Sequence, residues 1–289
     1  MGTLVINNEG FLALLKSDDG QLSEFISIVE LLRDLSFKLV MSNEYNLEEI
    51  FDELYIRSKS NEDVRIVSRI LEKLASYINN SDYENILKEI NDLIKEESSS
   101  FKDILENGAN FNHNFNTMCF RFNLNKGFRN VFTTEELIQS LLLFCQRIDD
   151  IISFVNELKI ILTELVFDED IAASMEELSD GFILRKGEII YHLYCIYNEI
   201  PKILCNGYVG YENIGRQMSI VCSPERNRDK VNEKLKKDIN GKSVNCELHT
   251  KMKRLTDNAP DRIYFCPSVP DGTGEVCGKI FVYKITKHA

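Results

Sequence analysis

The 289-residue sequence lacks several features that would assign it to a common class of protein. No uninterrupted apolar run approaches the roughly 18 to 20 residues that span a bilayer, and no charged and then apolar leader begins the chain. A glycine cluster between Asn206 and Gly215 lacks the Gly-Lys-Ser/Thr ending of a phosphate-binding loop. We therefore expect a soluble, cytoplasmic protein with no membrane partner and no nucleotide-cradling loop.

Cysteine pairing is also absent, because none of the eight cysteines forms a Cys-x-x-Cys motif. The thiols are scattered among apolar neighbours, which predicts reduced and mostly buried side chains. Zinc is the alternative, since five candidate ligands fall within 56 residues: Cys222, Cys246, His249, Cys266 and Cys277. Cys246 and His249 alternate onto opposite sides of one expected strand, so we favour core thiols and expect neither a metal ion nor a cofactor.

Charge is unevenly distributed along the chain, whose formal net charge is −12. Residues 216–289 hold 15 Lys or Arg against 9 Asp or Glu, a net of +6, so the remainder carries −18. Gly207, Gly210 and Gly215 mark the expected hinge between the two parts. This pattern predicts an acidic domain over residues 1–205 and a basic domain over 216–289 that binds a polyanion such as RNA.

Residues 1–205 are expected to form a mainly α-helical bundle. Asn46 with Glu49, Ser81 with Glu84, and Thr133 with Glu136 have the spacing of a capping box at a helix start. Each pair opens an amphipathic run with apolar residues at helical spacing. No catalytic constellation is visible there, so we expect a sensor, regulatory or partner-binding domain that engages a protein partner or inhibitor.

Residues 216–289 predict a small β-rich domain, which makes the whole protein α+β. A strand over residues 217–222 is followed by a helix that Ser223 and Pro224 open and Asn240-Gly241 ends. Three strands then follow in an expected antiparallel meander, over residues 244–253, 262–266 and 278–286.

Polar side chains gather on one face of this meander. Glu247, His249 and Lys251 alternate with apolar residues and therefore project from the same side of their strand. Arg262 and Tyr264 share one side of the next strand. An imidazole with a pKa near 6.5 serves as acid or base at neutral pH, and cations stabilise charge that develops on phosphorus. The face predicts metal-independent phosphoryl chemistry, or else an ordinary solvated surface.

His288 is a sixth candidate, although it is the penultimate residue. On a regular strand it lies on the side of Ile280 and Val282, whereas Lys287 lies with Phe281. A frayed end is the simpler interpretation of this position.

The order of elements in residues 216–289, with Arg-Ile-Tyr-Phe at 262–265 on the penultimate strand, resembles the ribonuclease toxins of the RelE type. The resemblance implies that strand-face Lys251, Arg262 and Tyr264 assist attack of an RNA 2′-hydroxyl on the adjacent phosphate. The chain departs from that family in having one helix instead of two and in offering His249 and His288.

Two functions of different class follow from the sequence. The first is a toxin-like or anti-phage defence effector, a hydrolase whose C-terminal ribonuclease module is regulated by the acidic helical domain. The alternative is a non-catalytic adaptor whose C-terminal module binds nucleic acid or a protein.

Overall fold

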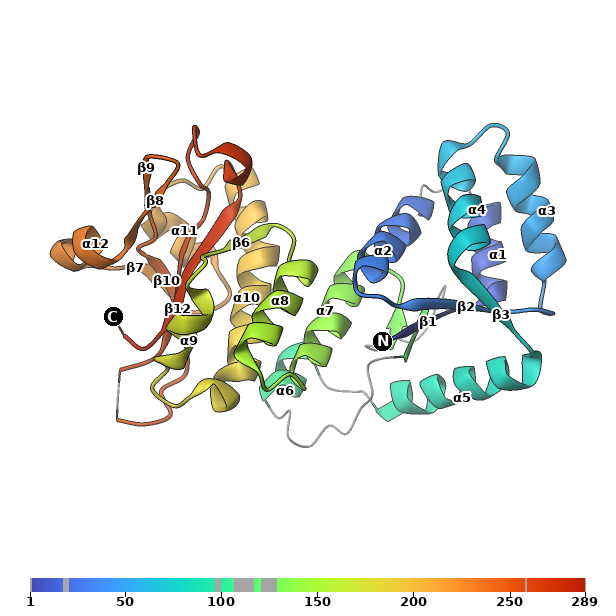
Figure 1. Ribbon diagram of the computed structural model, residues 1–289, viewed down its shortest axis with the longest axis horizontal. Coiled ribbons are helices and arrows are strands. Elements are labelled where there is room, and N and C mark those ends of the chain that lie inside the picture. The colour runs from blue at the N-terminus through green and yellow to red at the C-terminus, as the bar shows by residue number, and fades with distance from the viewer. Residues whose placement is uncertain are drawn as a thin grey trace. The chain divides into compact units, whose positions relative to one another are not determined.

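The computed structural model describes residues 2–17, 21–96, 100–106, 117–120, 129–257 and 259–288. The chain divides into two units, of which the first comprises Met1–Phe101 and Ala109–Phe144. The second comprises Lys102–Gly108 and Cys145–Ala289. Each unit has its own five-stranded sheet (Figure 1).

The first unit is built on a parallel sheet with strand order β3-β2-β1-β4-β5. Its strands are β1 (Thr3–Ile6), β2 (Lys38–Ser42), β3 (Ala75–Ile78), β4 (Thr117–Phe120) and β5 (Asn130–Val131). The helices between and after them are α1 (Asn8–Lys16), α2 (Leu22–Asp34), α3 (Leu47–Arg57), α4 (Glu62–Leu74), α5 (Asn80–Glu96) and α7 (Thr134–Cys145).

Helices cover both faces of this sheet, α1 to α4 on one side and α5 on the other (Figure 1). Phe25 of α2 contacts both Phe11 of α1 and Phe120 of β4, with ring centroids about 5 Å apart. On the opposite face α5 packs against Val5 and Cys119. Strands that are buried on both faces appear in a sequence as short continuous apolar runs, without alternation of polar and apolar residues. The predicted helical bundle is therefore incorrect for this unit, which is a three-layer α/β structure.

The second unit contains a mixed sheet with strand order β6-β12-β11-β10-β7, in which β6 and β12 are parallel and the other pairs antiparallel. Its strands are β6 (Leu165–Phe167), β7 (Cys222–Pro224), β10 (Leu248–Lys251), β11 (Arg262–Cys266) and β12 (Ile280–Thr286), and β8 (Lys236–Ile239) pairs separately with β9 (Lys242–Asn245). The helices are α6 (Phe101–Glu106), α8 (Ile151–Ile161), α9 (Ile171–Glu176), α10 (Phe182–Cys205), α11 (Tyr211–Gln217), α12 (Arg228–Lys234) and the short η2 (Gly274–Val276).

The boundary between the two units does not lie between residues 205 and 216, where the sequence predicted it. Strand β6 pairs with β12, so residues on both sides of the glycine cluster build one sheet. The division of charge disappears as a result. The second unit holds 21 Lys or Arg against 24 Asp or Glu, a net of −3, and the first unit carries the remaining −9.

The turn at Asn240-Gly241 was expected to end a helix, but it closes the β8-β9 hairpin. Both residues have positive φ, 53° and 75°, which is the conformation of the two central residues of a type I′ turn. Helix α12 accordingly ends at Lys234, and its N-cap is Asn227, whose side chain accepts a hydrogen bond from the Lys230 N–H. The predicted three-stranded meander is present as β10, β11 and β12.

A buried arginine joins α10 to the turn between β10 and β11. The Arg185 side chain is 2% exposed and its nitrogens lie 2.6 Å from Asp180, 2.7 Å from Glu188 and 3.1 Å from Asp261. Asp261 is completely buried and also accepts a hydrogen bond from the Ser179 N–H. Because Asp261 immediately precedes Arg262, this contact fixes the start of β11.

Replacing Arg185 by Met should destabilise the second unit by about 3 to 5 kcal/mol, because it leaves buried carboxylates without their cation. Urea unfolding followed by circular dichroism measures this loss. Arg216→Ala is the matched control, since Arg216 forms an exposed pair with Glu212 and should cost less than about 0.5 kcal/mol. Equal losses for the two variants would contradict the importance of the buried contact.

Candidate functional site

The antiparallel register brings four of the six predicted site residues onto one face of the second unit's sheet. His249 pairs with Tyr264, and Lys251 pairs with Arg262. On the next strand Lys284 pairs with Tyr264 and Thr286 with Arg262. Paired residues in an antiparallel sheet share a face, so the alternation in the sequence correctly placed these side chains together.

This face is covered, although the sequence suggested a solvated one. His249 is 2% exposed and Tyr264 is completely buried. Val231 and Leu235, on α12 and directly after it, pack against the Tyr264 ring. A helix therefore packs on this polar face of the sheet, and the buried residues of the face lie in a medium of low dielectric constant.

Glu225 joins this group as its main anion and was not among the predicted residues. Its carboxylate lies 2.9 Å from Nη1 of Arg262 and 3.6 Å from Nζ of Lys230. Burial alone would raise the pKa of Glu225, but a hydrogen bond from the Asn227 N–H, together with Lys230 and Arg262, lowers the pKa to about 2. One feature of the sequence points to Glu225: it is a charged residue directly after β7, the strand that pairs with β10.

The protonation state of His249 follows from its contacts. Its Nδ1 lies 3.1 Å from the backbone carbonyl oxygen of Glu247, which only accepts hydrogen bonds, so Nδ1 carries the proton. Burial and the positive charge of Arg262 lower the pKa of His249 to about 4. At neutral pH Nε2 is therefore a lone-pair acceptor, buried and without a partner among the described residues.

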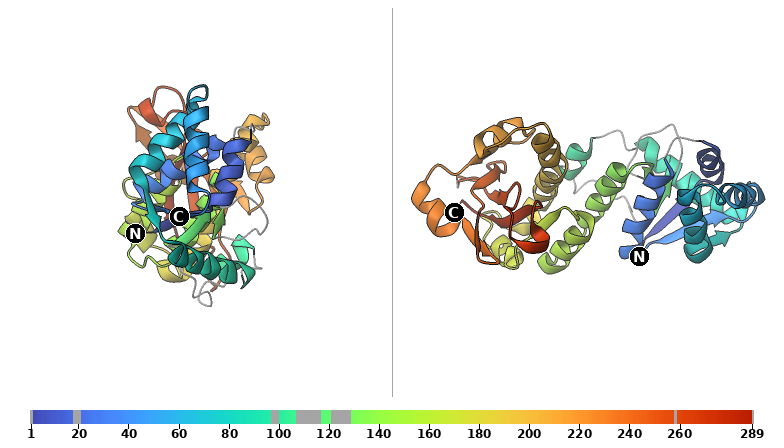
Figure 2. Two further views of the ribbon diagram at one scale, coloured as in Figure 1. Left: turned by 90° about the vertical axis from the view of Figure 1, so that its right-hand side faces the viewer. Right: turned by 90° about the horizontal axis from the view of Figure 1, so that it is seen from above.

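Glu247 and His288 occupy other positions than predicted. Glu247 precedes β10, and its carboxylate lies 2.7 Å from Nη1 of Arg228 on α12. His288 lies beside α12, where its Nδ1 is 3.5 Å from Nζ of Lys230. The right-hand view of Figure 2 shows the C-terminal end of the chain close to the orange ribbon that contains α12. Glu247 thus ties α12 to the sheet, and His288 stands at the edge of the group.

A cavity of about 400 Å³ opens beside His288, lined by residues of α9, α12 and β12. Lys234, Lys284 and Lys287 contribute ammonium groups to it. Lys237 also lines the cavity, but its ammonium group is held by Asp168 at 2.9 Å and by Glu169. Three lysines are thus available to a phosphate group, in a wall that also contains carboxylates.

Of the five candidate zinc ligands, Cys246, His249 and Cys266 are buried, Cys222 is half-buried and Cys277 is exposed. Burial raises the pKa of Cys222 to about 12 and also raises the pKa values of Cys246 and Cys266. Within the described residues, no group of three or more His, Cys, Asp or Glu side chains is arranged to hold a metal ion. Within those same ranges, no helix is long and apolar enough to cross a membrane.

No family model, curated protein or solved structure matches this chain. The class of protein is therefore defined by the fold alone, a three-layer α/β unit followed by an α+β unit with a mixed sheet.

Two buried histidines should make stability depend on pH. His192, whose Nδ1 lies 2.9 Å from Oγ1 of Thr250, also has its pKa lowered by burial to about 4. Between pH 6.5 and 4 the unfolded chain binds more protons at these residues than the folded chain, so the free energy of unfolding falls as the pH falls through this range. The loss should be on the order of 1 to 3 kcal/mol per histidine.

Urea unfolding at pH 7, 5.5 and 4.5 measures this effect for the parent protein and for His249→Gln. The variant should lose less stability between pH 7 and 4.5, because one of the two groups is gone. An identical pH dependence in both proteins would show that His249 is not buried in its neutral form.

Proposed function

We propose that this protein is an RNA-directed effector of the toxin or defence kind, whose second unit cleaves RNA without a metal ion. The observation that carries the proposal is the unpartnered Nε2 of His249, a neutral base held beside Arg262 and Tyr264. A buried polar atom without a hydrogen-bond partner calls for an explanation, and a catalytic role is one such explanation. The resemblance to RelE-type ribonuclease toxins supports the roles of Arg262 and Tyr264, and the proposal departs from that family in taking His249 as the base.

In the proposed reaction His249 Nε2 removes the proton from an RNA 2′-hydroxyl. The 2′-oxygen then forms a bond to the adjacent phosphorus, and the bond from phosphorus to the 5′-oxygen breaks. Arg262 and Lys230 stabilise the negative charge on the phosphate oxygens during this exchange. The Tyr264 hydroxyl, which accepts a hydrogen bond from Nη1 of Arg262, supplies the proton to the departing 5′-oxygen. The products are a 2′,3′-cyclic phosphate and a 5′-hydroxyl.

Substrate access requires α12 to move, because Val231 of α12 and the adjacent Leu235 pack on Tyr264, which is completely buried beside the buried His249. The lysine-lined cavity beside His288 is the proposed first contact for the RNA backbone. The first unit, with its net charge of −9, is the proposed regulatory part and the proposed contact for a protein partner or inhibitor.

Burial favours the second candidate, a non-catalytic adaptor that binds nucleic acid or a protein. Glu225 already neutralises Arg262 and Lys230, and Tyr264 is inaccessible. In this reading the polar group only holds α12 on the sheet, and the lysines of the cavity bind phosphate without any chemistry.

Cleavage of a fluorescent RNA oligonucleotide by the full-length protein in excess EDTA distinguishes the two functions. The effector should yield 2′,3′-cyclic phosphate ends by mass spectrometry, and an oligonucleotide with 2′-deoxy sugars should be resistant. His249→Gln should reduce the rate about 100-fold or more, the usual contribution of a general base. Persistence of activity in this variant would remove His249 from the mechanism.

Substitution of the cavity lysines separates binding from chemistry. Lys284→Ala should weaken RNA binding and make it less dependent on salt, because one phosphate contact is lost. Lys202→Ala on α10 is the matched control, since it removes an exposed lysine that does not line the cavity. RNA binding that Lys284→Ala reduces, with no cleavage by any protein, would favour the adaptor.

A further inference from the structure

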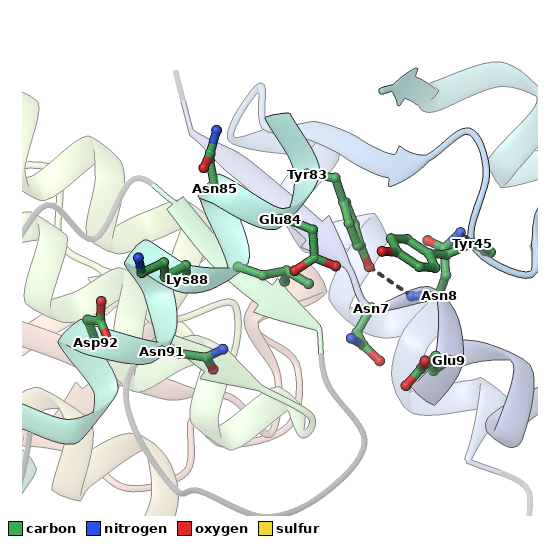
Figure 3. A pocket seen from close by; sticks show the side chains of 11 residues that line it. Asn7, Asn8, Glu9, Tyr45, Tyr83, Glu84, Asn85, Lys88, Asn91 and Asp92 are labelled. Carbon is green, nitrogen blue, oxygen red and sulfur yellow. Dashed lines mark hydrogen bonds between the residues drawn. The ribbon is translucent and has the colours of Figure 1, made fainter. Parts of the chain in front are cut away.

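A second cavity lies in the first unit, at the edge of the sheet where β1 ends. It has a volume of about 560 Å³, within the range of small-molecule sites. Asn7 and Asn8 directly follow β1 and line it together with Tyr45 and residues of α5 (Figure 3).

The position of this cavity is one where α/β proteins bind ligands. In the order β3-β2-β1-β4-β5, strands are added on one side of β1 and then on the other. The crevice at the carboxyl end of such a switch point is the general ligand site of open parallel sheets. The topology therefore points to this cavity independently of its lining.

The floor of the cavity is held rigidly by Asn8, which is 1% exposed. Its Nδ2 donates to the carbonyl oxygens of Ser42 at 3.1 Å and Tyr45 at 2.6 Å. Its backbone N–H donates to the Tyr83 hydroxyl at 3.0 Å, and that hydroxyl donates to the Ile6 carbonyl at 3.0 Å. These bonds fix the ends of β1 and β2 and the first turn of α5 around one space.

The lining is aromatic and acidic. The Tyr45 ring, 40% exposed, lies 6.2 Å from the Tyr83 ring, and the Glu84 carboxylate faces them from α5 (Figure 3). Glu9 adds a second carboxylate in the first turn of α1, and Lys88 adds one cation. A phosphate would meet these carboxylates unfavourably, whereas a flat ring that carries an amino group finds a stacking surface and acceptors.

We propose that this cavity binds a nucleoside with an exocyclic amino group, stacked on Tyr45 with its amino group donating to Glu84. The proposal is independent of RNA cleavage in the second unit.

Isothermal titration of the full-length protein with adenosine tests it. Adenosine should bind, inosine should bind about tenfold more weakly because it lacks the amino group, and adenosine triphosphate should bind more weakly than adenosine. Tyr45→Ala should weaken adenosine binding about tenfold, the typical contribution of a stacked base. Tyr55→Ala is the matched control, because Tyr55 is an exposed tyrosine of the same unit outside the cavity.

Glu84→Gln provides a second variant on the helix surface in case Tyr45→Ala fails to fold. It should weaken adenosine binding and reduce the preference for adenosine over the triphosphate. Absence of adenosine binding, equal affinity for inosine, or tighter binding of the triphosphate would overturn the proposal.

Discussion

The contact between buried Arg185 and Asp261 is the constraint on which the second unit depends. Arg185 lies near the start of α10 and Asp261 precedes β11, so the contact joins segments 76 residues apart. Backbone bonds continue from it, since the Met252 N–H donates to the Asp261 carbonyl at the end of β10. A charge that is fully desolvated must keep its partners, because separation leaves an uncompensated ion in a medium of low dielectric constant. The position of Arg262, and with it the candidate site, follows from this requirement.

The strands of the first unit could not be predicted from periodicity. β1 and β2 are four and five residues long, and buried on both faces, so they lack the alternation that marks a half-exposed strand. Of the three predicted capping boxes one is confirmed, and Ser81 lies inside α5, where Asn79 accepts the hydrogen bond from the Asp82 N–H. Thr133 and Glu136 exchange both hydrogen bonds of a capping box, at 3.2 and 3.0 Å. Asn46 has the same spacing from Glu49, yet it adopts φ of 51° and makes no side-chain cap, because the turn after β2 dictates its conformation.

Alternation in the C-terminal segment did predict which side chains share a face, because strand parity is a local property. It could not predict what covers that face. Helix α12, which packs on Tyr264 beside His249, is only seven residues long. The boundary of the unit depends on β6, which lies more than 110 residues before its partner β12. The lysine-lined cavity, and the contact of Glu225 with Arg262, both bring together residues that are far apart in the sequence. The net charges of residues 1–205 and 216–289 did not predict the net charges of the two units. The acidic residues of α8 to α10 belong to the same unit as the basic C-terminal strands.

In the proposed ribonuclease, the burial that keeps His249 neutral also keeps RNA away from it, and the free energy needed to expose His249 decides whether burial and cleavage are compatible. Displacing α12 exposes Val231 and Leu235, at about 1.5 to 3 kcal/mol for each side chain, and also separates Arg228 from Glu247 and Lys230 from Glu225. The two apolar side chains alone sum to about 3 to 6 kcal/mol, so the open fraction is on the order of 10⁻² to 10⁻⁴ or lower. In the proposed effector, contacts of RNA phosphates with the adjacent lysines would have to favour the open state by this amount. The proposed effector would therefore be inactive toward small solutes, and its RNA substrate would provide the free energy that exposes the base.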